Sequence, residues 1–157
     1  MAVPSVRLEV ETHAPEATEA IGRRLGARLR RGDVVALIGP LGAGKTVLAR
    51  GIAQGAGARG YVASPSFVVI REYAGPVRIY HADLYRLERA DDIADLGLDE
   101  LIDTGILIVE WADRACGVLP DEHIRVECVF GASETDRHLT LSASASLADR
   151  LDGVAGG

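Results

Sequence analysis

The sequence has no asparagine, one lysine and only two cysteines among its 157 residues. Cys116 and Cys128 are too few for a disulfide framework and do not form a CxxC pair, so we interpret both as buried thiols in a reducing cytoplasm. No apolar run approaches the roughly 20 residues that cross a bilayer. The first ten residues also lack the sections of a signal peptide. These absences exclude a disulfide scaffold and a membrane-spanning chain, and they favour a cytoplasmic protein.

The charge balance also excludes some functions. The formal net charge is −6, which argues against autonomous binding to naked nucleic acid. The composition, with 48% hydrophobic and 25% charged residues, is typical of one soluble domain with a sizeable core. Sixteen of the 17 basic residues are arginine. The remaining one is Lys45, so we ask what this lysine does that an arginine does not.

Apolar runs and amphipathic segments alternate along the chain, and this alternation is typical of an α/β fold. Strands are expected at Val6–Glu11, Val34–Ile38, Val68–Tyr73, Val77–His81, Ile106–Val109, His123–Phe130 and Arg137–Ser142. Helices are expected from Pro15 to about Gly32, from Lys45 to Gln54, and over Asp91–Leu101 with a break at Gly97. The sequence predicts a single domain over residues 1–157 with a mixed sheet and helices on both faces. Its tail, residues 143–157, is expected to be weakly ordered.

The segment Gly39–Thr46 has the pattern G-x-x-x-x-G-K-[ST] between a buried strand and a helix, which predicts a phosphate-binding loop. The glycines let successive backbone N–H groups turn toward one anion, and the helix N-terminus adds partial positive charge. Lys45 supplies a compact ammonium to the β- and γ-phosphates, and the larger planar guanidinium of an arginine would not fit in such a loop. The Thr46 hydroxyl is suited to Mg²⁺. The predicted phosphate-binding residues are Leu41, Gly42, Ala43, Gly44, Lys45 and Thr46.

The same segment does not identify the base. Switch-type GTPases carry an [N/T]-K-x-D element for guanine, and a chain with no asparagine and no second lysine cannot contain it. ATP is therefore the expected nucleotide.

Two acids follow predicted strands and are candidates for the metal and for catalysis. Glu110 ends the apolar strand Ile106–Val109, as in a Walker B element, and Asp83 follows the strand that ends at His81. The carboxyl ends of parallel strands meet at one edge of the sheet, where a triphosphate and Mg²⁺ need carboxylates. Lys45, Asp83 and Glu110 are thus the expected catalytic residues, with Thr46, Glu110 and Asp83 at the metal.

Other residues near these motifs carry weaker signals. Ser64 and Ser66 lie in a polar turn about twenty residues after the loop, where nucleotide-sensing switches often lie, and an ordinary turn is the alternative. Trp111, the only tryptophan, is either a half-buried aromatic or a partner contact. We interpret His81 and Tyr85 as structural. The arginines between Arg23 and Arg31 fit a solvated helix face better than an RNA contact.

Five segments together resemble the TsaE family, also called YjeE: Gly39–Thr46 (GPLGAGKT), Ser64–Phe67 (SPSF), His81–Leu87 (HADLYRL), Asp95–Asp103 (DLGLDELID) and Ile106–Pro120 (ILIVEWADR…LP). The resemblance covers nearly the whole chain. It implies a three-layer P-loop NTPase-like α/β domain that binds ATP and Mg²⁺ and hydrolyses ATP weakly alone. It also implies partnership with TsaD and TsaB in threonylcarbamoyladenosine modification of tRNA, with the tRNA handled by the partners.

The family pattern is not matched everywhere. Pro40 stands where an acid is common, Val47 replaces a frequent second threonine, Ser66 replaces threonine and Ala82 replaces phenylalanine. The first two changes leave the phosphate chemistry intact, and Ser66 keeps a hydroxyl.

Two other functions share the loop. A small-molecule kinase of similar length would carry an arginine-bearing lid. The sequence shows no such insertion after the second apolar strand, where only residues 112–120 precede the next expected strand. A nucleotide-gated binding module with negligible turnover fits the lone acid at Glu110.

Overall fold

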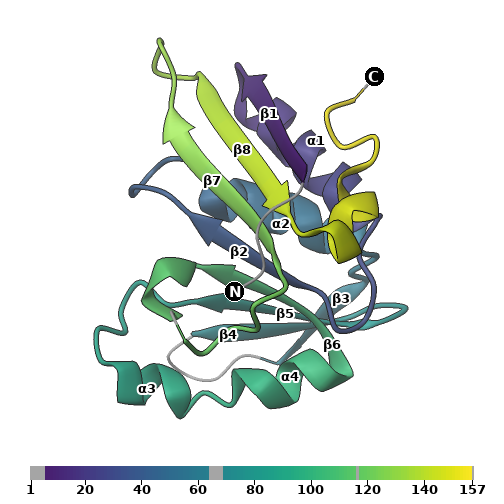
Figure 1. Cartoon of the computed structure of the whole chain (residues 1–157), viewed down its shortest axis with the longest axis vertical. Coiled ribbons are helices and arrows are strands. Elements are labelled where there is room, and N and C mark those ends of the chain that lie inside the picture. Colours follow the sequence, from purple (N-terminus) through teal and green to yellow (C-terminus); the bar gives the residue numbers. More distant parts are fainter. Residues whose placement is uncertain (1–5, 64–68, 116, 157) are drawn as a thin grey trace.

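The structure, a computed structural model, describes residues 6–63, 69–115 and 117–156. Within these ranges, eight strands form one sheet in the order β1-β8-β7-β2-β6-β5-β4-β3 (Figure 1). The strands are β1 (Val6–Thr12), β2 (Val34–Ile38), β3 (Gly60–Ala63), β4 (Ile70–Ala74), β5 (Arg78–Asp83), β6 (Gly105–Glu110), β7 (Ile124–Phe130) and β8 (Arg137–Ala143). The four central strands, β7, β2, β6 and β5, are parallel, and the outer strands pair antiparallel. The predicted mixed sheet is confirmed.

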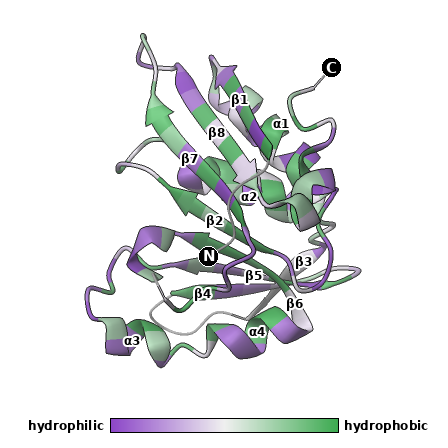
Figure 2. Ribbon diagram, viewed as in Figure 1, coloured by the Kyte–Doolittle hydropathy of each residue, from purple (hydrophilic) through white to green (hydrophobic). Residues whose placement is uncertain are grey.

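Helices cover both faces of this sheet. Two of them, α1 (Pro15–Gly26) and α2 (Lys45–Gly55), pack on one face, whereas the short helices α3 (Ala90–Ala94) and α4 (Leu98–Thr104) pack on the other. Neighbouring residues of β2 face opposite ways: Val35 and Leu37 belong to the core under α1 and α2, and Val34 and Ala36 to the core under α3 and α4. This explains why β2 is continuously apolar, as Figure 2 shows, and it confirms the predicted three-layer α/β fold.

Glycines bring α1 and α2 unusually close. A Cβ atom on Gly22 or Gly26 of α1 would collide with carbonyl oxygens of α2, and one on Gly51 or Gly55 of α2 would collide with carbonyl oxygens of α1. The two helix backbones therefore touch directly along this line. Since α2 begins at Lys45, this contact fixes the helix that carries the end of the predicted phosphate-binding loop.

The observed elements differ from expectation in two main places. The first helix ends at Gly26 rather than near Gly32. Strand β3 was not predicted, and it forms the sheet edge by pairing with β4. The two strands joined at Gly75–Pro76 are antiparallel, as predicted, and Gly97 separates α3 from α4 with φ 70°. Two further 3-10 turns are η1 (Ala112–Ala115) and η2 (Ala145–Leu151).

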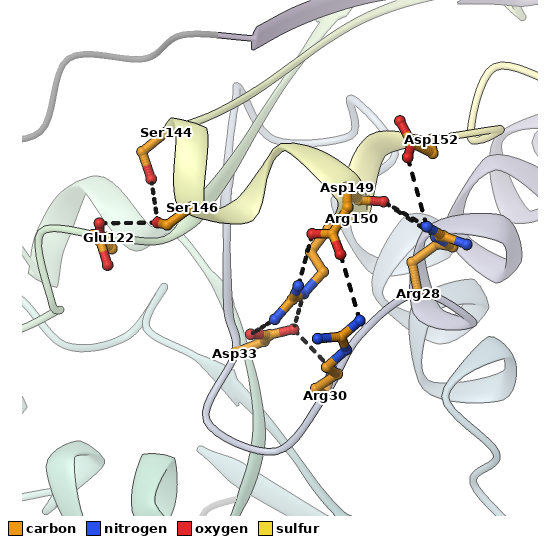
Figure 3. Close-up of polar contacts among 9 residues, drawn as sticks. All are labelled: Arg28, Arg30, Asp33, Glu122, Ser144, Ser146, Asp149, Arg150 and Asp152. Atoms are coloured by element: carbon orange, nitrogen blue, oxygen red, sulfur yellow. Dashed lines mark hydrogen bonds and ion pairs between the residues drawn. The ribbon is translucent and has the colours of Figure 1, made fainter.

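The C-terminal segment corrects the expectation of a weakly ordered tail, at least for residues 145–154. Leu151 and Val154 lie buried in the core beside α1. The guanidinium of Arg150 donates to both carboxylate oxygens of Asp33, at 2.8 and 3.2 Å, and both side chains are buried (Figure 3). Apolar burial and this ion pair hold the segment to the domain.

Arg24, Arg28 and Arg30, from the cluster between positions 23 and 31, contribute to the same attachment. Arg24 donates to the carbonyl of Val154 and Arg28 to that of Asp149, while Arg23 pairs with Glu19 on its own helix (Figure 3 for Arg28). These contacts support the structural interpretation of the cluster.

Candidate functional site

The segment predicted to bind phosphate connects β2 to α2, so it has the strand–loop–helix setting that such a loop requires. Gly44, the last residue before the helix, has φ 101°, a conformation that favours glycine. At Gly39 a Cβ atom would collide with the carbonyl oxygen of Cys128 on β7. These two positions therefore need glycine for different reasons, one for backbone conformation and one for space.

The backbone amides of the loop are left open. In the described part of the chain, Ala43 is the only residue of 41–46 whose N–H donates to another backbone group, the carbonyl of Pro40 at 3.2 Å. That bond closes a turn, and the amides of the other five residues are not engaged with the backbone. A curled loop with open amides at a helix N-terminus is suited to binding an anion.

Lys45 lies at the centre of the site and is buried, with 4% of its surface exposed. Its Nζ atom donates to the carbonyls of Gly39 and Pro40, at 2.5 and 2.7 Å, and lies 4.2 Å from the centre of the Trp111 ring. Burial lowers the pKa of Lys45, and the nearby carboxylates of Glu110 and Asp83 oppose that shift. The ammonium is thus held by weak acceptors of its own loop rather than by a carboxylate.

Glu110 is the buried carboxylate of the site. One of its oxygens accepts the hydroxyl hydrogen of Thr46 at 2.8 Å, and the other lies 2.6 Å from Nε2 of His81. Burial would raise the pKa of Glu110, but the hydrogen bonds from His81 and Thr46 and the charge of Lys45 outweigh it and hold the pKa below its usual value. Glu110 is therefore an ionised acceptor with both oxygens already oriented.

Asp83 lies beside Glu110 because β5 and β6 are parallel neighbours and these two residues are partners in register at their carboxyl ends. The carboxylate of Asp83 accepts a hydrogen bond from the N–H of Tyr85 at 3.0 Å. The backbone N–H of Asp83 donates to the carbonyl of Val69, the residue before β4. Both acids face a cavity of about 250 Å³, which is lined by Leu41, Gly42, Gly44, Lys45, Thr46, Val47, Asp83, Tyr85, Glu110 and Trp111.

An aromatic cluster forms one wall of this cavity. Trp111 has φ 58°, the only positive φ among the described non-glycine residues, and this turns the chain from β6 into η1. The Tyr85 ring is 5.1 Å from the Trp111 ring, and the Arg114 guanidinium lies 5.1 Å from the same ring. Arg114 also donates to the carbonyls of Leu84, Tyr85 and Leu87. Arg114 thereby fastens the segment after β5 to the segment after β6.

The structure brings together nearly all the residues that the sequence predicted for the site. Every predicted loop residue except Ala43 lines one cavity together with Asp83, Glu110 and Trp111. Ala43 is instead fully buried in the core. Ser64 and Ser66 lie outside the described residues, as does Cys116, whereas Cys128 is a buried free thiol whose pKa burial raises to about 12. Sequence reasoning missed His81 as a site residue, although its position two before Asp83 on one strand places both on the same side.

Comparison with known proteins identifies the family. A family model described as "Threonylcarbamoyl adenosine biosynthesis protein TsaE" matches residues 12–139. The chain belongs to the TsaE family. The resemblance found in the sequence motifs is therefore confirmed.

Individual TsaE proteins are similar over most of their length. The tRNA threonylcarbamoyladenosine biosynthesis protein TsaE of Bacillus subtilis is 40% identical over 139 residues, covering 87% of this chain and 86% of that protein. The Streptomyces coelicolor TsaE is 39% identical over 130 residues, covering 78% and 87%. The crystal structure of Bacillus subtilis YdiB has a TM-score of 0.77 and 33% identity, covering 96% of this chain and 94% of that one. The P-loop NTPase-like fold of TsaE is thus shared.

Two structural features are not found in the described part of this TsaE chain. Within the described ranges, no helix has the length and apolar character to cross a bilayer. Nor do three or more His, Cys, Asp or Glu side chains gather there as a preformed metal site. Mg²⁺ commonly keeps several waters and takes one or two carboxylates plus substrate phosphates.

Proposed function

We propose that the protein is a Mg²⁺-dependent ATPase, converting ATP to ADP and phosphate, that supports a complex of TsaB and TsaD in threonylcarbamoyladenosine modification of tRNA. The observation that carries the ATPase proposal is the single cavity that joins the open amides of the loop, the Lys45 ammonium and two strand-end carboxylates. Membership of a tRNA threonylcarbamoyladenosine biosynthesis family supports the pathway.

The state of Lys45 supports triphosphate binding. Its ammonium now contacts two carbonyls and an indole ring, which are neutral groups. Phosphate oxygens are stronger acceptors for a cation, because charge-assisted hydrogen bonds are roughly twice as strong as neutral ones. A bound triphosphate therefore draws Nζ away from the loop carbonyls, and the loop amides bind the same phosphates.

The side chains around Glu110 fit a magnesium ion held between protein and phosphates. The hydroxyl of Thr46 and the carboxylates of Glu110 and Asp83 are hard oxygen ligands, and all three residues line the cavity. Mg²⁺ bound there would neutralise phosphate charge as the terminal phosphate leaves. The protein's own contribution is to hold Glu110 ionised and oriented, so that one carboxylate serves the metal or the attacking water.

A second hollow offers room for the nucleoside. It measures about 260 Å³ and is lined by Pro15, Thr18, Gly42, Gly44, Val47, Glu134, Thr135 and Arg137. It shares Gly42, Gly44 and Val47 with the first cavity, so the two meet at the loop. We place the phosphates in the first hollow, which holds the lysine and the acids, and the adenosine in the second.

Exposed apolar side chains near the loop support dependence on protein partners. Leu41, Tyr85 and Phe130 are the exposed large hydrophobic residues of the described chain, with 67%, 45% and 52% of their surface exposed. Leu41 and Tyr85 line the phosphate cavity, and the Phe130 ring lies beside Gly42. Apolar groups gathered around a site mark a contact surface. A partner such as TsaD or TsaB docking there would cover the nucleotide.

The deciding experiment measures phosphate release from ATP with and without TsaB and TsaD, for the parent protein, Glu110→Gln and the exposed control Glu88→Gln. We expect turnover that rises with the partners, and a loss of about 100-fold in Glu110→Gln with nucleotide still bound. Glu88→Gln should match the parent. A phosphorylated small molecule among the products would show a kinase instead, and negligible turnover even with both partners would show a binding module.

A further inference from the structure

Two neighbouring hollows are lined by arginine and by no acid, and one of them shares Thr46 with the phosphate cavity. The first, of about 290 Å³, lies between α2 and strands β4 and β5, and its arginines are Arg50, Arg59 and Arg71. The second, of about 610 Å³, adjoins the turn between β4 and β5, and its arginines are Arg31, Arg59 and Arg78. Arg59 lines both, so the two hollows are adjacent, and we call them together the arginine groove. Among the described residues that line it, none is Asp or Glu.

This distribution contrasts with the rest of an acidic chain, which has 23 acidic and 17 basic residues. Among the described residues, six arginines outside the groove form ion pairs with carboxylates, as Arg150 does with Asp33. Within the described residues, neither Arg50 nor Arg71 has a carboxylate within ion-pair distance, and both are exposed. Of the five, Arg78 alone forms an ion pair, with Glu72 at 3.4 Å. The groove thus concentrates positive charge on a protein of net negative charge.

The floor of the groove is apolar and partly aromatic. Ala49 and Ala53 of α2 line it, with Ala58 after the helix and Tyr73 of β4 opposite. Apolar surface flanked by guanidinium groups suits a ligand that has both repeated anionic groups and flat rings. Aromatic side chains and arginine planes stack on nucleic-acid bases, and guanidinium groups bind phosphates through two parallel hydrogen bonds.

We propose that this arginine groove binds RNA through its phosphodiester backbone. The arginines are spread along two adjacent hollows rather than gathered at one point, which matches a chain of evenly repeated charges better than a single anion. The net charge of −6 argues against direct RNA contact by the protein as a whole. At short range, however, the attraction depends on local charge, because salt largely screens charges that are more than about 10 Å apart. The inference adds an RNA contact to the proposed function and does not depend on ATP hydrolysis.

The test measures binding of a fluorescently labelled tRNA transcript by anisotropy, without nucleotide, at several salt concentrations. The groove variant is Arg50→Ala/Arg59→Ala/Arg71→Ala. The matched control removes three exposed arginines outside the groove, in Arg7→Ala/Arg89→Ala/Arg125→Ala. We expect the parent to bind with an affinity that falls with salt by a log–log slope of about −2 to −3. The groove variant should bind at least tenfold more weakly at low salt with a flatter slope, and the control should stay within twofold of the parent.

Several results would overturn the proposal. These are no binding by the parent at low salt, equal losses in the groove and control variants, and competition by polyglutamate as strong as by unlabelled tRNA, which would identify an acidic protein segment as the ligand. ATP binding and thermal unfolding of each variant, measured in parallel, show whether the fold and the nucleotide site are intact. Should the triple variant unfold, the charge reversal Arg71→Glu provides the same comparison against Arg125→Glu.

Discussion

The Nε2 atom of His81 lies 2.6 Å from Oε2 of Glu110, and both side chains are buried, with 8% and 2% of their surface exposed. The other carboxylate oxygen of Glu110 accepts the hydroxyl of Thr46. His81 therefore fixes the direction in which Glu110 presents its charge to the cavity, and its role is to position the carboxylate.

This contact predicts the effect of changing His81. In His81→Phe, Glu110 loses a hydrogen-bond donor. We expect kcat for ATP hydrolysis to fall about 10- to 100-fold, the loss typical when a residue that hydrogen-bonds to a metal-binding side chain is removed. ATP affinity without Mg²⁺ should change little. His81→Gln retains an N–H donor and should recover part of the rate. A rate in His81→Phe equal to that of the parent, measured by phosphate release, would show that Glu110 needs no such support.

The pKa of Glu110 predicts how stability depends on pH. Because the pKa is lower in the folded protein than the ordinary value of 4.5, the ionised carboxylate stabilises the fold above that value. The contribution is lost as the pH falls from about 4.5 through the folded pKa. The parent should therefore lose stability more steeply than Glu110→Gln over this range. Urea unfolding at about pH 7 and about pH 3 measures both. If the free energies of unfolding of the parent and of Glu110→Gln changed equally between these two pH values, the lowered pKa of Glu110 would be contradicted.

The close contact of α1 and α2 predicts that a single methyl group is damaging. In Gly26→Ala the new Cβ would collide with the carbonyl oxygen of Ile52, so the helices must separate. We expect a loss of about 1–3 kcal/mol in the free energy of unfolding, because overpacking forces the backbone to shift. Gly60→Ala is the control, since a Cβ there meets nothing within 4 Å. Equal unfolding midpoints for the two variants would contradict the contact.

The Arg150–Asp33 pair predicts that the tail contributes to stability. Arg150→Ala leaves the buried Asp33 carboxylate with only the N–H of Arg30, at 2.8 Å, among the donors described here. Removing one partner of a buried pair typically costs about 3–5 kcal/mol. The matched variant Arg125→Ala breaks the exposed pair with Glu127 and should cost less than about 1 kcal/mol. Similar losses in the two variants, by denaturant unfolding, would show that the tail is only loosely attached.

The sequence predicted those features that depend on neighbouring residues. The loop before α2, the two strand-end acids and the break at Gly97 all follow from local patterns, and parallel pairing of β5 and β6 then brings Asp83 beside Glu110. By contrast, Arg150 and Asp33 are 117 positions apart, and neither carries a local signal for the other.

The same reason explains the missed role of His81. A histidine on an apolar strand fits many environments, and its partner Glu110 lies 29 positions later. The helix contact through Gly22, Gly26, Gly51 and Gly55 likewise depends on how two helices meet in space. Sequence reasoning identified residues that line the proposed nucleotide site, and the structure added the residues that position them.

The central claim is that the loop amides and the Lys45 ammonium bind the phosphates of ATP. Isothermal titration of ATP with Mg²⁺ into the parent protein and into Lys45→Ala tests it most directly. We predict saturable one-to-one binding to the parent and no measurable binding to Lys45→Ala, with unfolding curves showing that the variant is folded. An undiminished affinity in Lys45→Ala, or a folded parent that binds no ATP, would contradict the account.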